Sequence, residues 1–78
     1  MTTSTPDPVQ LDSTSLAAAA YDRRGGKLRL DFRDGTCYLY SGVGFGLYLE
    51  LLCAPSKGLF FNRFIRGHFP HAKLPPEN

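Results

Sequence analysis

Residues 27–40 read Lys-Leu-Arg-Leu-Asp-Phe-Arg-Asp-Gly-Thr-Cys-Tyr-Leu-Tyr, and this stretch predicts a β-hairpin. Apolar residues at every second position from Leu28 to Phe32 alternate with charged ones. A period of two is typical of a strand that buries one face. Asp34-Gly35 is a turn sequence that leads into a second strand over 36–43. The hairpin therefore forms the centre of an antiparallel sheet.

The length of this turn decides which face of the sheet carries Tyr38 and Tyr40. A two-residue turn pairs Asp31 with Tyr38 and places both rings on the charged face, as an aromatic and basic platform. A three-residue turn, with Gly35 in the left-handed conformation, pairs Leu30 with Tyr38 and turns both rings into the core. A slip of one residue exchanges the two faces. We expect the core register, because it buries two large rings in a short chain that has little core.

The flanking segments predict one more strand and two helices. Four alanines within Leu16 to Tyr21 favour a helix by propensity, but the segment is short and ends at an Arg-Arg-Gly-Gly turn, so we expect a strand. Apolar residues then recur at helical spacing: Leu47, Tyr48, Leu51 and Leu52. Pro55 ends this helix, and Ser56 is placed to cap a second helix that runs to about Arg66 and closes at Gly67.

These elements predict a small α+β domain, in which a three-stranded antiparallel meander is packed on one face by two helices. A chain of 78 residues has room for one core, which excludes an enzyme with separate cofactor and substrate domains. We expect the domain to span 15–72, between a flexible lead-in over 1–14, rich in Thr, Ser, Pro and Asp, and a flexible tail over 73–78 that ends in Pro-Pro-Glu-Asn.

Charge and cysteine content restrict function only weakly. Nine Lys and Arg against seven Asp and Glu give a net charge of +2, which is too small to indicate a nucleic-acid partner. The chain shows neither a signal-peptide pattern nor a long apolar run, so we expect a cytoplasmic protein. We expect Cys37 and Cys53 to be free and packed like small apolar residues, because neither lies in a paired or zinc-ligand spacing.

Basic residues are concentrated between Ala54 and Lys73, a segment that contains no acidic residue. Arg and Asn side chains suit phosphates and base edges, because a forked donor can bind two acceptors at once. The segment predicts an anion-binding helix, although such residues can also simply face solvent and its phenylalanines can serve the core. The expected contacts are Lys57, Asn62, Arg63 and Arg66, with His68 and Lys73 in support, and with Arg29 and Arg33 added only if the charged sheet face adjoins the helix.

Catalytic patterns are weak. The nucleotide-binding glycine motifs, the zinc-protease motif and the serine-hydrolase elbow are absent, so we expect no cofactor, no metal and no catalysis. His68 and His71, three residues apart, leave a metal-free nuclease as a weaker alternative.

A family resemblance covers most of the structured part. Residues 54–70 read Ala-Pro-Ser-Lys-Gly-Leu-Phe-Phe-Asn-Arg-Phe-Ile-Arg-Gly-His-Phe-Pro and resemble the signature of the KTSC domain family. Tyr38-Leu39-Tyr40 resembles the central YxY motif of the family, and the resemblance extends over about 16–71. The positions that carry it in the second helix are Ser56, Lys57, Gly58, Phe60, Phe61, Asn62, Ile65 and Arg66.

The resemblance implies a compact α+β domain without an established role. Such domains occur at the C-terminus of some lysyl-tRNA synthetases and as small bacterial and phage proteins, and the fusion implies RNA binding by association. The chain departs from the family at Gly44-Phe45-Gly46, where proline and acidic residues are usual, and at Leu49, which is usually polar. Alanines also replace its N-terminal strand.

Two functions are therefore expected. The first is a non-catalytic module that binds nucleic acid, RNA rather than DNA, through the basic helix. The alternative is a protein-interaction module or homodimer that uses an exposed apolar patch around Leu49 with Phe45 and Leu59.

Overall fold

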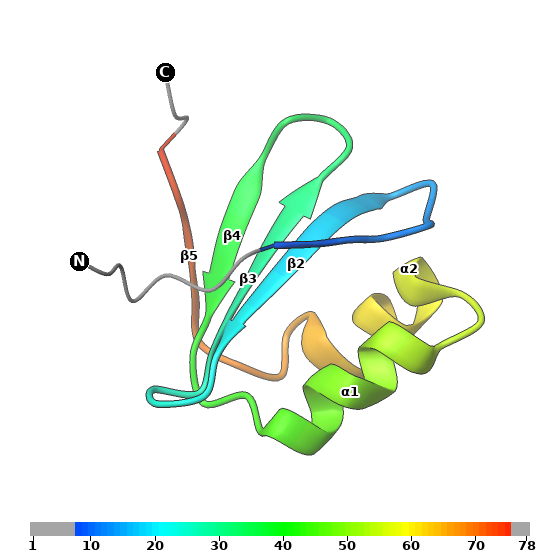
Figure 1. Cartoon of the computed structure of the whole chain (residues 1–78). Helices are drawn as coiled ribbons and strands as arrows, with labels where there is room; N and C mark the ends of the chain where they lie inside the picture. Colours follow the sequence, from blue (N-terminus) through cyan, green and yellow to red (C-terminus); the bar gives the residue numbers. More distant parts are fainter. Residues whose placement is uncertain (1–7, 76–78) are drawn as a thin grey trace.

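One five-stranded antiparallel sheet, with helices on one face, makes up the computed structural model, which describes residues 8–75 (Figure 1). The strands follow the chain in the order β1-β2-β3-β4-β5, and the helical segments lie between β4 and β5. This confirms an α+β fold. The elements are β1 (Val9–Gln10), β2 (Leu16–Asp22), β3 (Lys27–Phe32), β4 (Cys37–Tyr40), α1 (Phe45–Cys53), α2 (Lys57–Phe60), the π-helix η1 (Phe61–Ile65) and β5 (His71–Lys73).

The expected count of three strands is wrong, because two short strands, β1 and β5, add to the edges of the meander. Neither shows an alternating pattern; each exists through pairing with its neighbour, β1 with β2 and β5 with β4. Both extend beyond the expected limits of 15–72, and the expected flexibility of 1–7 and 76–78 falls outside the described residues. Within the described part of the lead-in, Leu11 is buried in the core cluster.

Arg33 holds this N-terminal segment against the sheet. Its guanidinium donates hydrogen bonds to the backbone carbonyl of Ser13 at 3.0 Å and to that of Leu11 at 2.9 Å. The backbone N–H of Leu11 donates in turn to Ala17 at 2.9 Å. Arg33 therefore has a structural role. Because its guanidinium is bound to the N-terminal segment, the expected extension of the binding surface to Arg33 is not supported.

The expected core register of the central hairpin is confirmed. Leu30 pairs with Tyr38 and Leu28 with Tyr40. The turn contains three residues and ends at Gly35, whose φ of 94° lies in the region that glycine adopts without the steric cost of a side chain. The N–H of Phe32 donates to Thr36 at 2.8 Å and closes the hairpin.

The alanine-rich segment forms strand β2, as expected, with a bulge near its start. The pairing shifts between Leu16, opposite Phe32, and Ala18, opposite Asp31. Side chains alternate along a regular strand, so Leu16 and Ala19 would point to opposite faces without the extra residue. With the bulge, both join the hydrophobic core.

The helices cover the sheet with a narrow set of apolar side chains. Tyr48 and Leu51 of α1 and Phe61 and Ile65 of η1 are buried. Ser56 caps α2 by accepting the N–H of Leu59 at 3.3 Å, as expected. The second helix differs from expectation in widening to a π-helix, closed by a bond from the N–H of Arg66 to Phe61 at 2.8 Å. No helix among residues 8–75 is long and apolar enough to cross a membrane.

The two cysteines are both free, as expected, but only one of them is packed. Cys37 on β4 is half-buried. Cys53 is exposed, because it lies at the end of α1 on the side away from the buried residues Tyr48 and Leu51.

Tyr21 joins the sheet to the start of the helical layer. Its ring stacks on Tyr48 with centroids 4.8 Å apart, and its hydroxyl donates to the backbone carbonyl of Val43 at 2.5 Å. The N–H of Val43 donates to Gly26 in the β2–β3 turn at 2.9 Å. Both backbone groups of Val43 are thus satisfied by residues of the first hairpin.

Tyr21→Phe should lower the free energy of unfolding by about 1–3 kcal/mol, because the buried carbonyl of Val43 loses its donor. Urea denaturation measures this change. Tyr38→Phe is the matched control: its hydroxyl makes no hydrogen bond with residues 8–75, so a change below about 0.5 kcal/mol is expected. Equal effects of the two substitutions would contradict a specific role for the Tyr21 hydroxyl.

Candidate functional site

A cleft of about 500 Å³ lies between strand β4, strand β5 and the end of η1, and we name it the β4–β5 cleft. Its lining combines rings with charged and polar groups from four parts of the chain. The lining residues are Phe32, Asp34, Thr36, Tyr38, Tyr40, Phe61, Arg66, Gly67 and His71.

The register of the hairpin places Tyr38 and Tyr40 on the sheet face that packs against the helices. The cleft exists because the helices cover only part of this face. The ring contacts of α1 reach β2, through Tyr21, and Phe61 of η1 reaches as far as Tyr40 on β4. All three residues of β5 are exposed. In Figure 1 the helices lie on the side of the sheet away from β5. Tyr40 is therefore buried, while Tyr38 stays half-buried at the wall of the cleft.

Strand β5 adds a histidine and a lysine to this aromatic surface. His71 pairs with Tyr40 and Lys73 with Tyr38, and residues directly opposite in an antiparallel pair project from the same face. The imidazole of His71 lies 5.5 Å from the ring of Tyr40 and 5.9 Å from that of Tyr38, between centroids. The rings of Tyr38 and His71 therefore lie at the cleft, with the buried ring of Tyr40 beside them.

The two ends of the β4–β5 cleft carry opposite charges. Arg66 lines the end near Tyr40, and Asp34 lines the end at the hairpin turn. Asp34 Oδ1 accepts the hydroxyl of Thr36 at 2.7 Å and its N–H at 3.0 Å. These bonds lower the pKa of Asp34, with a smaller contribution from the positive charge of Lys73. The carboxylate is therefore ionised at neutral pH.

The basic residues singled out in the sequence lie around different surfaces. Arg66 lines the β4–β5 cleft and Lys73 lies beside it, whereas Arg63 lines an apolar groove on another side of the helix. Asn62 contacts Arg66, whose Nη1 lies 3.4 Å from its Oδ1. His68 is exposed and does not line the β4–β5 cleft.

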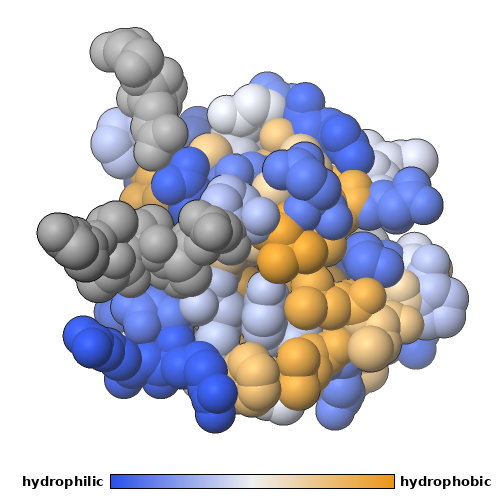
Figure 2. Space-filling view, viewed as in Figure 1, coloured by the Kyte–Doolittle hydropathy of each residue, from blue (hydrophilic) through white to orange (hydrophobic). Residues whose placement is uncertain are grey.

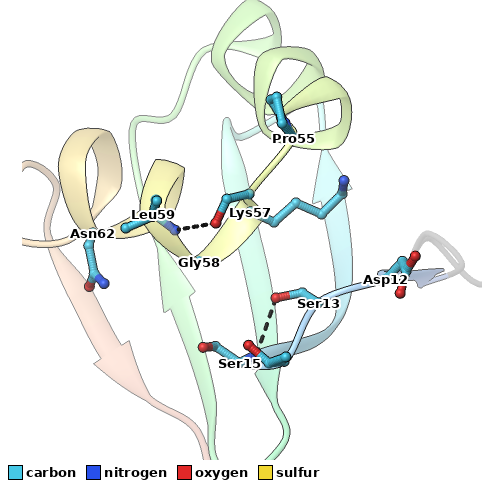
Figure 3. Close-up of a pocket in the computed structure, with 10 residues that line it drawn as sticks. Asp12, Ser13, Ser15, Pro55, Lys57, Gly58, Leu59 and Asn62 are labelled. Carbon is cyan, nitrogen blue, oxygen red and sulfur yellow. Dashed lines mark hydrogen bonds between the residues drawn. The ribbon is translucent and has the colours of Figure 1, made fainter.

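Lys57 and Asn62 line a third, polar groove of about 400 Å³, together with Ser13 and Ser15 (Figure 3). The ammonium of Lys57 donates to the backbone carbonyl of Ala54 at 3.0 Å, which holds it at the N-terminal end of α2. Figure 3 shows the two side chains pointing in different directions, so they do not converge on one point.

The charged face of the sheet is separate from these surfaces. Arg29 forms a salt bridge with Asp31 at 2.9 Å and lies 3.6 Å from the sulfur of Cys37. Hydrogen bonding to Asp31, followed by burial, raises the pKa of the Cys37 thiol, which disfavours the nucleophilic thiolate. Arg29 faces away from the β4–β5 cleft, so the charged sheet face does not extend the surface of the cleft.

A second surface feature is apolar and lies over the helices. Figure 2 shows orange residues gathered where Figure 1 places the helical layer. Leu59 is 70% exposed, and Phe64 is 47% exposed beside an apolar groove of about 330 Å³ that also contains Phe60. We name the exposed residues Phe45, Leu49, Leu59 and Phe64 the helical apolar patch.

Residues 8–75 contain no group of three His, Cys, Asp or Glu side chains that could hold a metal ion. Of the two histidines that carried the weaker nuclease alternative, His71 lines the β4–β5 cleft and His68 does not.

Sequence analysis did not group Asp34, Thr36 and His71 in one site. It considered Tyr38 and Tyr40 only as core residues or as part of an aromatic platform on the charged face. The YxY motif was the one signal for the tyrosines. The sequence of β5 shows no strand pattern, so the position of His71 opposite Tyr40 could not be predicted.

Comparisons with known proteins agree with this architecture. Residues 12–69 match the KTSC domain. A lysine–tRNA ligase of Nostoc sp. is 35% identical over 63 residues, which cover 81% of this chain but 11% of the ligase. A protein of Tsukamurella paurometabola is 36% identical over 59 residues, 76% of this chain and 88% of that protein. The crystal structure of a KTSC domain protein from Yersinia pestis superimposes with a TM-score of 0.86 at 29% identity, covering 88% of this chain and 97% of that one.

The pKa of Tyr40 depends on its neighbours in the β4–β5 cleft. Burial, then the neighbouring Tyr38, raises the pKa of Tyr40, while Arg66 lowers it. A tyrosine in an unfolded chain ionises near pH 10. The raised pKa therefore stabilises the fold below that pH, and we expect this contribution to be lost as pH rises toward the folded-state pKa.

Arg66→Ala should raise the pKa of Tyr40 further, because the nearby positive charge is removed. Titration of the tyrosine Cζ chemical shifts by NMR measures it residue by residue. Arg63→Ala removes the same charge from another side of the helix and should leave the Tyr40 titration unchanged. An equal shift in both variants would contradict the placement of Arg66 in the cleft.

Proposed function

The chain belongs to the KTSC domain family, and from this membership and the β4–β5 cleft we propose that it is a non-catalytic module that binds single-stranded RNA. The lysine–tRNA ligases that carry a similar segment act on an RNA, although this chain spans only 11% of the first of them. This association suggests RNA as the ligand, and the residues of the cleft suggest how RNA would be bound.

The observation that carries the proposal is the accessible ring pair of Tyr38 and His71, which lies against the buried ring of Tyr40. Single-stranded nucleic acids bind proteins by stacking bases on aromatic side chains next to basic groups that follow the backbone. The half-buried Tyr38 and the exposed His71 offer ring surface that the core does not cover. A base paired in a duplex has no free face to stack there, so unpaired RNA fits better.

Basic groups stand on two sides of these rings. Arg66 lines the cleft from the end of η1, and Lys73 projects from the face of β5 that carries His71. A guanidinium binds two phosphate oxygens at once, whereas lysine acts as a mobile point charge. We propose Arg66 as the main phosphate contact, with Lys73 supporting it. Arg63, Lys57 and Asn62 bind RNA only weakly in this proposal, because they face other grooves.

Arg66→Ala and Tyr38→Ala should both weaken RNA binding, in different ways. Removal of the Arg66 charge should make the dependence of log affinity on log salt shallower by about 0.7 for each phosphate that is no longer neutralised. Removal of the Tyr38 ring should cost about 1–3 kcal/mol of binding free energy with little change in that slope. Fluorescence anisotropy with labelled single-stranded RNA, from low to physiological salt, measures both quantities.

Arg63→Ala is the matched control, because it removes an arginine from the same helix but from another groove. A gel of the recovered RNA separates binding from cleavage, and intact RNA would count against the nuclease alternative. If the wild-type protein binds no RNA at low salt, or if Arg63→Ala weakens binding as much as Arg66→Ala does, the proposal is wrong.

The helical apolar patch favours a second candidate function, self-association of the domain. A leucine that is 70% exposed beside an apolar groove has much surface to bury against a partner. Leu49, a departure from the family pattern, is 44% exposed on α1 and adds apolar surface to the helical layer. We propose a second copy of this chain as the occupant.

Leu59→Asp and Leu49→Asp should convert a dimer to a monomer in sedimentation velocity, because each places a charge in the apolar contact. Val9→Asp alters an apolar residue of similar exposure, 41%, on the far edge strand β1 and should leave the dimer intact. A wild-type protein that sediments as a monomer at high concentration would exclude this candidate.

A further inference from the structure

Asp34 is an unusual member of a site for a polyanion. Its carboxylate lines the same cleft as Arg66, the tyrosines and His71, and it is ionised at neutral pH because Thr36 donates two hydrogen bonds to it. A negative charge there repels phosphate. A ligand group that donates hydrogen bonds therefore fits this end of the cleft better than a phosphate does.

The polarity of the cleft follows strand β4. Thr36 lies at the end with Asp34, and Tyr40 lies near Arg66, with Tyr38 between them. At about 3.3 Å per residue, Thr36 and Tyr40 are separated by roughly 13 Å along the strand. An acceptor end, an aromatic middle and a basic end thus follow each other over a length comparable to that of one nucleotide.

We propose that the β4–β5 cleft selects an unpaired guanine nucleotide, with the base stacked beside Tyr38, its Watson–Crick edge on Asp34 and its phosphate on Arg66. The inference rests on the proposed RNA-binding function and names the base that this function prefers.

The donor pattern of the bases leads to guanine. Guanine presents its N1–H and N2–H groups side by side, and both can donate to one carboxylate. Cytosine and adenine each present an amino group next to a ring-nitrogen acceptor, and uracil presents one N–H between two carbonyl oxygens. An ionised carboxylate only accepts hydrogen bonds and repels those acceptors. Asp34 therefore distinguishes guanine from the other three bases.

Asp34 also keeps the capacity to bind such an edge. A carboxylate has about four acceptor sites, and the two bonds from Thr36 both end on Oδ1. Lys73 is close enough to lower the pKa of Asp34 but forms no salt bridge with it among the described residues. The turn therefore presents the carboxylate already oriented by Thr36.

The test uses seven-residue RNA oligomers of uridine that carry one central guanosine, cytidine, adenosine or inosine, with anisotropy as the readout. We expect the guanosine oligomer to bind about tenfold more tightly than the all-uridine one, within the range that one well-placed base contact gives. Inosine lacks the N2 amino group of guanine, so we expect it to lose a large part of this preference.

Asp34→Asn should abolish the preference for guanosine. The asparagine oxygen can still accept both bonds from Thr36, which keeps the turn, but the side chain now places a donor against the base. Asp12→Asn removes the same charge from the neighbouring polar groove and should leave the preference unchanged.

The outcomes separate this inference from the proposed function. Equal binding of all oligomers with an intact salt dependence would overturn the guanine assignment and leave RNA binding standing. An increase in affinity for every oligomer in Asp34→Asn, with the preference retained, would show that Asp34 acts only through its charge and would also overturn the assignment. Absence of binding to any oligomer would overturn both.

Discussion

The three-residue turn that ends at Gly35 fixes the register on which the rest of the structure depends. With Gly35 at a φ of 94°, Leu30 lies opposite Tyr38 and Leu28 opposite Tyr40, so two leucines and two tyrosines share one face. That face becomes both the core and the wall of the β4–β5 cleft. A shift of one residue would move the tyrosines to the charged face beside Arg29 and Asp31, which would take Tyr40 out of the core and remove the wall of this cleft.

A small helical layer on a wider sheet then divides that face into two environments. Residues opposite the helices, such as Leu28 and Leu30, are fully buried. The tyrosines on β4 lie at the edge of the region that the helices cover and line the cleft. The same edge receives β5, which adds exposed polar side chains next to the rings. Aromatic surface and positive charge meet at the margin of the core, and this juxtaposition does not require a dedicated loop or an insertion.

The sequence was sufficient for the elements that have a strong local pattern. Alternation predicted β3, the turn sequence predicted the hairpin, and the serine cap and apolar spacing predicted the helices. Edge strands β1 and β5 could not be predicted, because two or three residues carry no periodicity and are held in place by pairing with a neighbour. The bulge that lets Leu16 and Ala19 share a face was equally invisible, since it depends on the partner strand.

The candidate site shows why charge counting along a chain has limited value. Four basic residues between Ala54 and Lys73 suggested one basic helix, yet the helix distributes Lys57, Arg63 and Arg66 among three different grooves. The packing of the end of η1 against the β4–β5 edge brings the basic and aromatic groups together, because it places Arg66 near Tyr40. Spacing within the helix separated an aromatic row from a polar row, but Phe64 of the aromatic row is 47% exposed. Only the packing of η1 against β4 determines which helix residues share a surface with the tyrosines.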